Sequence, residues 1–225
     1  MGGSEQSTTR RIERIGLIGD VHTERARLAG VLKHFATLGL DAVLCTGDLP
    51  DGPGSAGDVD ACVRLLQEHG VLTIAGNHDR WLLDGEMRDL TGATEKHELA
   101  PETLAFLSRL PMTREFDSPS GRVLLCHGMG ADDMATVQPH DHGLALEDND
   151  ALQRVLRMAT YRCVMSGHSH RATQRTLGNV MMINAGTLLT GQGPCCTVAD
   201  LHALAVQVYA VDDDGRVSGT PTLRS

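Results

Sequence analysis

Short apolar runs alternate with amphipathic segments along the first third of the chain. Residues 15–18, 42–46 and 71–74 are apolar runs of strand length, and we interpret the last as a buried strand. Between them, apolar residues recur at helical spacing over residues 28–36 and 59–66. This β-α-β-α-β alternation predicts parallel strands joined by right-handed crossovers, so that their carboxyl ends meet at one edge of a sheet.

The middle of the chain continues the alternation less regularly. Helices are predicted over residues 81–90 and 101–110, the second beginning at Pro101-Glu102, and a third over residues 152–159. Strands are predicted over residues 122–126 and 163–165. The segment between Gly128 and Asn149, rich in His, Asp and Gly, is interpreted as a loop, either solvated or closing over a substrate.

Helical periodicity disappears after Arg171. Residues 180–184 and 197–211 are predicted to be strands of a second sheet. Residues 1–9 are polar and rich in Gly and Ser, which predicts a disordered tail. No linker or internal repeat interrupts the remainder, so residues 10–225 are expected to form a single domain.

Polar side chains capable of binding metal follow five of the predicted strands. The clusters are Asp20-Val21-His22, Gly47-Asp48, Gly76-Asn77-His78-Asp79, Cys126-His127-Gly128 and Gly167-His168-Ser169-His170. Ligands bind at the carboxyl ends of strands in open α/β sheets. Gly76 is expected to let the backbone turn sharply there. The donors are oxygen and nitrogen atoms without thiolates, a set that suits Mn²⁺, Fe or Zn²⁺ better than a structural cysteine site.

Taken together and in this order, the five clusters resemble those of the calcineurin-like metallophosphoesterases. The segment Asn184-Ala185-Gly186-Thr187 also looks like the Asn-Pro-Gly-Ser segment of their small bacterial and archaeal phosphodiesterase branch. The resemblance implies an α/β fold, a four-layer αββα sandwich of two mixed sheets flanked by helices. It also implies metal-dependent hydrolysis of a phosphoric ester.

The resemblance further implies a role for each matching residue. One divalent ion would be held by Asp20, His22 and His170, a second by Asn77, His127 and His168, with Asp48 bridging the two. Such ions lie roughly 3.5–4 Å apart, and a hydroxide that bridges them would attack phosphorus. Mn²⁺ is favoured, with Fe, Zn²⁺ or Ni²⁺ as alternatives. His78 would protonate the leaving group, oriented by Asp79.

Two missing arginines narrow the class of substrate. Protein phosphatases and dinucleoside-polyphosphate hydrolases of this kind carry one Arg after the bridging Asp motif and another before Gly-Asn-His. Here both arginines are absent from the corresponding stretches, Gly47-Asp48-Leu49-Pro50-Asp51-Gly52 and Ala75-Gly76-Asn77-His78. A phosphomonoester dianion would lose two bidentate partners, so a phosphodiester or small nucleotide is favoured. The alternatives are a phosphomonoesterase or protein phosphatase of the same superfamily, and a non-catalytic interaction scaffold on the same fold.

Composition restricts the partners. The chain has 225 residues and a formal charge of -9, with no long run of Lys or Arg, which argues against extended nucleic-acid binding. No apolar run reaches membrane-spanning length, so no association with a membrane is expected. A small phosphorylated substrate is the expected partner. The composition does not decide between a monomer and a homo-oligomer. The six cysteines form no Cys-x-x-Cys pair. They are expected to be buried free thiols, which favours a cytoplasmic location.

Overall fold

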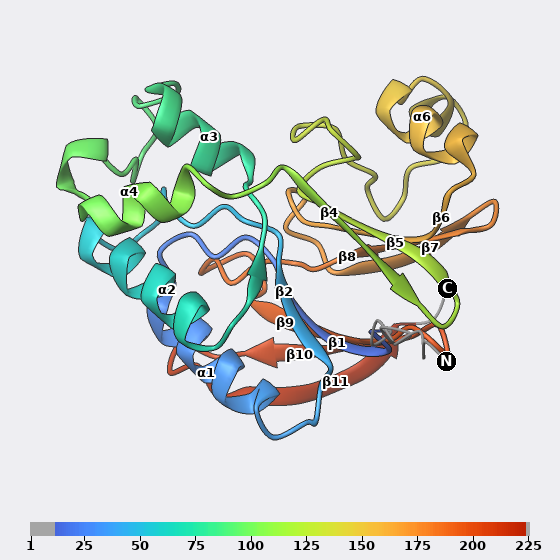
Figure 1. The fold of residues 1–225 in the computed structure, drawn as a ribbon, viewed down its shortest axis with the longest axis horizontal. Coiled ribbons are helices and arrows are strands. Elements are labelled where there is room, and N and C mark those ends of the chain that lie inside the picture. Colours follow the sequence, from blue (N-terminus) through green and yellow to red (C-terminus); the bar gives the residue numbers. More distant parts are fainter. Residues whose placement is uncertain (1–11, 224–225) are drawn as a thin grey trace, which may run out of the picture.

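Two β-sheets pack face to face in the computed structural model, which describes residues 12–223 (Figure 1). The first sheet contains, in spatial order, β11 (Val217–Leu223), β10 (Ala205–Val211), β9 (Cys195–Asp200), β1 (Arg14–Ile18), β2 (Ala42–Cys45) and β3 (Leu72–Thr73). The second contains β4 (Thr113–Ser118), β5 (Gly121–Cys126), β6 (Tyr161–Ser166), β8 (Val180–Asn184) and β7 (Thr173–Leu177). Each sheet combines parallel and antiparallel pairs.

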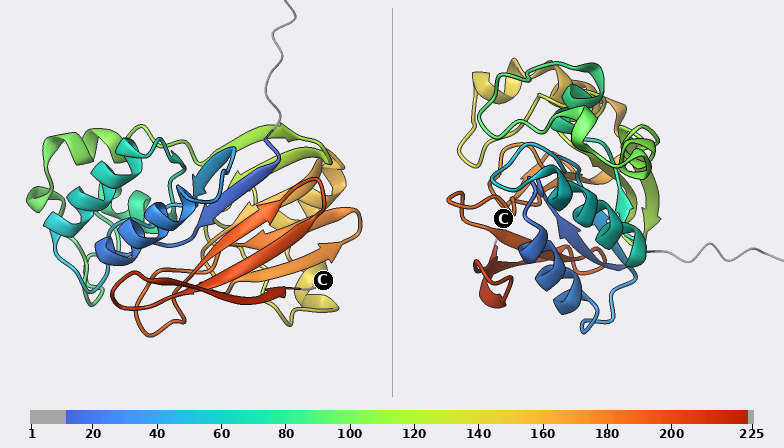
Figure 2. Two further views of the ribbon diagram at one scale, coloured as in Figure 1. Left: turned by 90° about the horizontal axis from the view of Figure 1, so that it is seen from below. Right: turned by 90° about the vertical axis from the view of Figure 1, so that its left-hand side faces the viewer.

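Helices cover the outer face of each sheet (Figures 1 and 2). On the first sheet, α1 (Arg25–Phe35) and α2 (Ala56–Glu68) contribute residues to a buried apolar cluster. On the second, α6 (Asp150–Met158) packs its buried residues against β5, β6 and β8. A third cluster fills the space between the sheets. The predicted αββα sandwich of two mixed sheets is therefore confirmed.

The alternation of side chains along β1 shows how the sequence produces these layers. Ile15 and Leu17 face the second sheet, whereas Ile18 faces the helices, because successive strand residues point to opposite sides. Gly16 also faces the helices, where a Cβ atom would lie 2.5 Å from the ring of Phe35. The glycine therefore lets α1 pack directly onto the strand.

The remaining helices are short. They are α3 (Asn77–Asp84), a 3₁₀ turn (Lys96–Glu98), α4 (Pro101–Leu107) and α5 (Leu144–Glu147). Among the described residues, no helix combines the length and apolar character needed to cross a membrane. All six cysteines are buried and free, as expected.

The strands after Arg171 depart from the prediction of a separate second sheet. Only β7 and β8 join the second sheet, whereas β9 pairs antiparallel with β1 and thereby extends the first sheet through β10 and β11. The prediction is wrong here because strand pairing depends on distant partners. Strand length and apolar composition carry no information about those partners.

Two other elements differ from their predicted extent. The buried strand expected over residues 71–74 is only β3, at the edge of the first sheet, where Leu72 is 36% exposed. The helix expected over residues 81–90 is instead α3, which begins at Asn77 and ends at Asp84, just before Gly85. Gly85 adopts a left-handed conformation with φ 73°, which glycine accommodates readily and which ends the helix. The predicted tail, residues 1–9, lies outside the described residues.

Candidate metal centre

The candidate ligands lie where strands of both sheets end. In the first sheet, β1 is followed by Asp20 and His22, β2 by Asp48, and β3 by Asn77. In the second sheet, β5 leads into His127, and β6 is followed by His168 and His170. Because β1, β2 and β3 are parallel, as are β5 and β6, each sheet presents its ligands at one edge.

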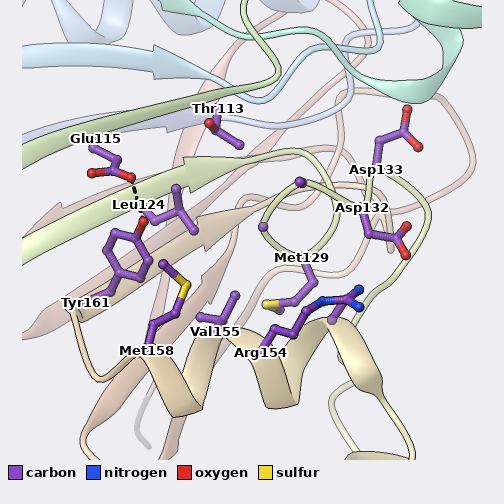
Figure 3. A pocket seen from close by; sticks show the side chains of 13 residues that line it. Thr113, Glu115, Leu124, Met129, Asp132, Asp133, Arg154, Val155, Met158 and Tyr161 are labelled. Carbon is purple, nitrogen blue, oxygen red and sulfur yellow. Dashed lines mark hydrogen bonds between the residues drawn. The ribbon is translucent and has the colours of Figure 1, made fainter.

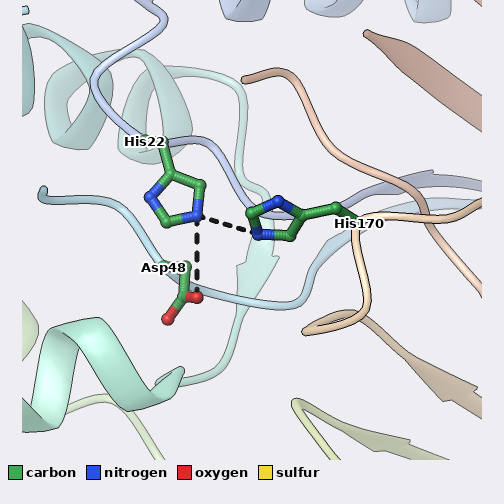
Figure 4. A group of neighbouring side chains, drawn as sticks. All are labelled: His22, Asp48 and His170. Atoms are coloured by element: carbon green, nitrogen blue, oxygen red, sulfur yellow. Dashed lines mark hydrogen bonds and ion pairs between the residues drawn. The ribbon is translucent and has the colours of Figure 1, made fainter. Parts of the chain in front are cut away.

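The His22 imidazole lies between Asp48 and the His170 imidazole, and the two rings come from different sheets (Figure 4). His22 Nε2 lies 3.8 Å from Asp48 Oδ2 and 3.2 Å from His170 Nε2. His170 Nε2 is also 3.5 Å from Asp20 Oδ2. Two ring nitrogens and two carboxylates therefore converge on one small volume, as the ligands of a single ion do.

A second convergence of donors contains the same Asp48. His127 Nε2 lies 3.3 Å from Asp48 Oδ2 and 2.8 Å from Asn77 Oδ1. His168 Nδ1 is 2.8 Å from the same Asn77 oxygen. The ligand atoms of Asp20, Asp48 and His127 all lie within 4.8 Å of one another, as do those of His22, Asp48 and His170.

Backbone carbonyls orient two of the histidines. His127 Nδ1 is 2.7 Å from the carbonyl oxygen of Thr46, and His22 Nδ1 is 2.7 Å from that of Asp51. A proton on Nδ1 that is donated to a carbonyl leaves the Nε2 lone pair to bind metal, which is the usual arrangement of metal-binding histidines. These supporting contacts connect loops distant in sequence, so the motifs did not predict them.

The backbone of the site is strained at the ligands themselves. His22, Asp48, His168 and His170 all have positive φ, between 44° and 65°. Such left-handed conformations are uncommon for residues other than glycine and cost of order 1–3 kcal/mol each. They persist only where the surroundings determine them strongly, and they are concentrated at functional sites.

The electrostatics of the cluster suit a bound cation. Asp20 and Asp48 are both fully buried, and Asp20 Oδ2 has no hydrogen-bond partner among the described residues. Burial alone would lower the pKa of His127, but the charges of Asp48 and Asp20 raise it to about 10. The negative field is thus strong enough to favour an extra positive charge in the buried cluster. The residues present therefore fit divalent metal ions.

Gly76 provides space beside Asp48 and His127. The sequence predicted a sharp turn at this residue, but its φ of -97° and ψ of -178° are extended values that any residue adopts. A Cβ atom there would lie 2.2 Å from Asp48 Oδ1 and 2.8 Å from His127 Nδ1. Glycine is needed because α3 approaches the two candidate ligands closely.

Asp51, and not Asp79, makes the side-chain hydrogen bond to His78. Asp51 Oδ2 is 2.8 Å from His78 Nδ1, and Arg88 binds both oxygens of this carboxylate, at 2.9 and 2.8 Å. Burial opposes ionisation of Asp51, but His78 and Arg88 lower its pKa to about 2. The sequence offered one signal for this contact, an acidic residue three positions after Asp48. The contact between Arg88 and Asp51 could not be predicted from the sequence, because no motif contains Arg88.

Asp79 instead joins two loops of the site. Its carboxylate accepts hydrogen bonds from the backbone amides of Gly76 and Asp48, both at 2.8 Å, and of Leu49 at 3.1 Å. Burial and the charge of Asp48 raise the pKa of Asp79 to about 6, although the three amides act in the opposite direction. Asp79 therefore positions the backbone that presents Asp48 and Asn77.

Replacing Asp79 with Ala should destabilise the metal-stripped protein by at least ~3 kcal/mol. Hydrogen bonds to a charged group contribute about 1.5–3 kcal/mol each, and the substitution leaves three backbone donors without their acceptor. Urea unfolding measures the change, with the exposed Asp89→Ala as the matched control. Equal stability of the two variants would contradict this role for Asp79.

A separate cavity lies on the outer side of the second sheet (Figure 3). Its volume is ≈ 610 Å³, and it lies between β4, β5, α6 and the loop that follows His127. Leu124, Met129 and Val155 form part of an apolar wall, and Asp132 and Arg154 add charge. No candidate metal ligand lines this cavity, so its size does not mark the chemical site.

A sandwich of two mixed sheets that gathers carboxylates, imidazoles and an amide at its strand ends defines a metallophosphoesterase type of protein. The sequence profile of the calcineurin-like phosphoesterase superfamily domain matches residues 14–205. The chain therefore belongs to this superfamily, as the five motifs predicted.

Individual relatives are distant. An uncharacterized protein of Methanocaldococcus jannaschii is 29% identical over 120 residues, which cover 50% of this chain and 48% of that protein. The match thus spans about half the length of this curated relative. The fold is similar to a metallophosphoesterase from Sphaerobacter thermophilus, with TM-score 0.67, 20% identity and coverage of 90% and 89%. It is also similar to an archaeal phosphodiesterase, with TM-score 0.55, 14% identity and coverage of 88% and 99%.

Proposed function

We propose that this chain is a dinuclear metal-dependent phosphoesterase that hydrolyses a phosphodiester or a small nucleotide ester. The observation that carries the proposal is the position of Asp48. Its carboxylate belongs to both groups of candidate ligands, one with His22 and His170 and the other with Asp20 and His127. Asp20 is assigned to the ion of the first group because its Oδ2 lies 3.5 Å from His170 Nε2. A carboxylate has enough lone pairs to serve two ions at once.

The proposed ligands divide between two ions that share Asp48. One ion would be held by Asp20, His22 and His170, and the other by Asn77, His127 and His168. When bound, the ions supply positive charge that attracts a phosphate group, activates water for attack on phosphorus and stabilises the charge that grows on the phosphoryl oxygens. This mixture of oxygen and nitrogen donors favours Mn²⁺, with Fe, Zn²⁺ or Ni²⁺ as alternatives.

His78 is the proposed proton donor to the leaving oxygen. Its backbone amide donates to Asp48 Oδ1 at 2.9 Å, which places the residue directly beside the shared carboxylate. Its Nδ1 is held by Asp51, so Nε2 is the ring nitrogen available to donate to a substrate. The side chain is 20% exposed, which leaves a route for a substrate to reach it. Asp51 acts as a positioning residue, held in turn by Arg88.

The arginines near the site support a diester over a phosphomonoester dianion. Arg88 is committed to Asp51 through two hydrogen bonds. Arg80 binds Asp133 at 2.7 and 3.2 Å and Glu86 at 2.9 Å. Neither guanidinium is therefore available as a bidentate partner for a phosphate without first losing carboxylate contacts. A diester, with one negative charge, has less need of such partners.

Mn²⁺ should restore ester hydrolysis to protein that has been stripped of metal with a chelator. The panel comprises bis-p-nitrophenyl phosphate, p-nitrophenyl phosphate, mononucleotides and a phosphopeptide, because these separate diesterase, monoesterase and protein phosphatase activities. We expect the diester or a nucleotide to be hydrolysed fastest. Failure of every ester with Mn²⁺, Fe, Zn²⁺ and Ni²⁺, together with tight binding of a protein partner, would favour the interaction scaffold and overturn the proposal.

A further inference from the structure

The only tryptophan of the chain lies against the proposed proton donor. The ring centroids of Trp81 and His78 are 4.6 Å apart, and the ring planes meet at 63°. Both residues belong to α3, whose first residue is the candidate ligand Asn77. Side chains on a helix lean toward its N-terminus, so Trp81 covers the turn that contains Asn77 and His78.

Trp81 is not part of the hydrophobic core. Its neighbour Leu82 is fully buried in the cluster between the helices and the first sheet, and Leu83 packs against that cluster. Trp81 is only half-buried and belongs to none of the three apolar clusters that the described residues form. A large aromatic side chain that is kept out of the core and beside a reactive group is available to contact a ligand.

We propose that Trp81 is a stacking platform for a nucleobase on the leaving-group side of the substrate. The inference rests on the proposed function, because His78 defines the leaving side only if it donates the proton there. It deepens that function by naming the substrate class, a nucleotide ester. Stacking also provides binding energy at a site where Arg80 and Arg88 are already paired with carboxylates.

The sole tryptophan gives a direct test that does not require turnover. Mn²⁺-loaded protein is titrated with AMP and with ribose 5-phosphate, which share the sugar phosphate and differ by the base, while tryptophan emission is recorded. Free N-acetyltryptophanamide corrects for absorption by adenine. We expect AMP to quench the emission in a saturable way and ribose 5-phosphate to leave it nearly unchanged. An equal response to both ligands, or to neither, would overturn the platform.

Substitutions of Trp81 separate stacking from support of His78. Removing an aromatic platform costs about 5- to 150-fold in affinity for a base. In an assay of ester hydrolysis, Trp81→Leu should therefore raise the inhibition constant of AMP by that factor and leave the inhibition constant of ribose 5-phosphate unchanged. Trp81→Phe should retain most of the preference for AMP over ribose 5-phosphate. Met87→Ala, which removes an apolar side chain that is 47% exposed just beyond α3, is the matched control and should change neither constant.

The two proposals can fail independently. If esters are hydrolysed but Trp81→Leu changes the inhibition constant of neither AMP nor ribose 5-phosphate, the platform is wrong and the phosphoesterase proposal stands. If Trp81→Leu weakens both inhibitors to the same extent, the residue supports the site as a whole and the platform is again overturned. If no ester is hydrolysed but AMP alone still quenches, Trp81 stacks on the base, but its assignment to the leaving-group side is overturned together with the proposed catalytic function.

Discussion

Replacing Asp48 with Asn is expected to reduce turnover by more than ~100-fold and to lower the amount of metal bound per chain. Loss of a residue that only supports a metal ligand costs about 10- to 100-fold, so loss of the one carboxylate proposed to serve both ions should exceed that range. Asn keeps the shape of the side chain and an oxygen for the backbone amide of His78, which lies 2.9 Å from Asp48 Oδ1. It removes the negative charge beside His22 and His127.

Metal content and turnover are measured together on the same preparation. Asp133→Asn is the matched control, because Asp133 is also buried and close to the site but its carboxylate binds Arg80. The control should keep the metal content of the wild type. Unchanged metal stoichiometry and turnover in Asp48→Asn would rule out the two-ion assignment.

His78→Ala should bind metal normally and lose activity selectively toward esters with poor leaving groups. A general acid contributes typically ~10²–10⁴-fold, so that loss is expected for an alkoxide, which needs a proton to depart. The loss should be much smaller for a nitrophenolate, which departs without one. The comparison is made within one variant, so any general loss of folding or of metal affects both esters equally.

Two further variants make the leaving-group test specific. His142→Ala changes an exposed histidine in the loop before α5 and should affect neither ester. Asp51→Ala removes the carboxylate that holds His78 Nδ1 and should reproduce the same selectivity with a smaller loss. Equal losses for both leaving groups in His78→Ala would assign His78 to phosphate binding or to support of Asn77, and the proton-donor role would be abandoned.

The sequence by itself predicted the class of fold and the superfamily. Each motif combines a strand-length apolar run with a glycine or polar residue at its end, and this information is local. The parallel order of β1, β2 and β3 also followed from the alternation of strands with helices, so Asp20, Asp48 and Asn77 were expected at one edge. The structure places them there.

Contacts between loops were decided only by the tertiary structure. The partner of His78 was expected to be its neighbour Asp79, but a helix directs adjacent side chains to different sides. Asp79 therefore turns toward the backbone amides of the loop after β2, whereas His78 meets Asp51 across the site. Arg88, which holds Asp51, comes from a segment beyond α3 that carries no motif.

The sheet that the last strands join likewise could not be predicted from local sequence patterns. The apolar pattern identified β9 and β10 as strands, but their pairing partner β1 lies near the other end of the sequence. Local patterns determine which residues form strands and which polar side chains end them, because both follow from neighbours along the chain. Pairing between distant strands, and the hydrogen bonds that orient the site, depend on which surfaces meet after folding, and only the tertiary structure decides that.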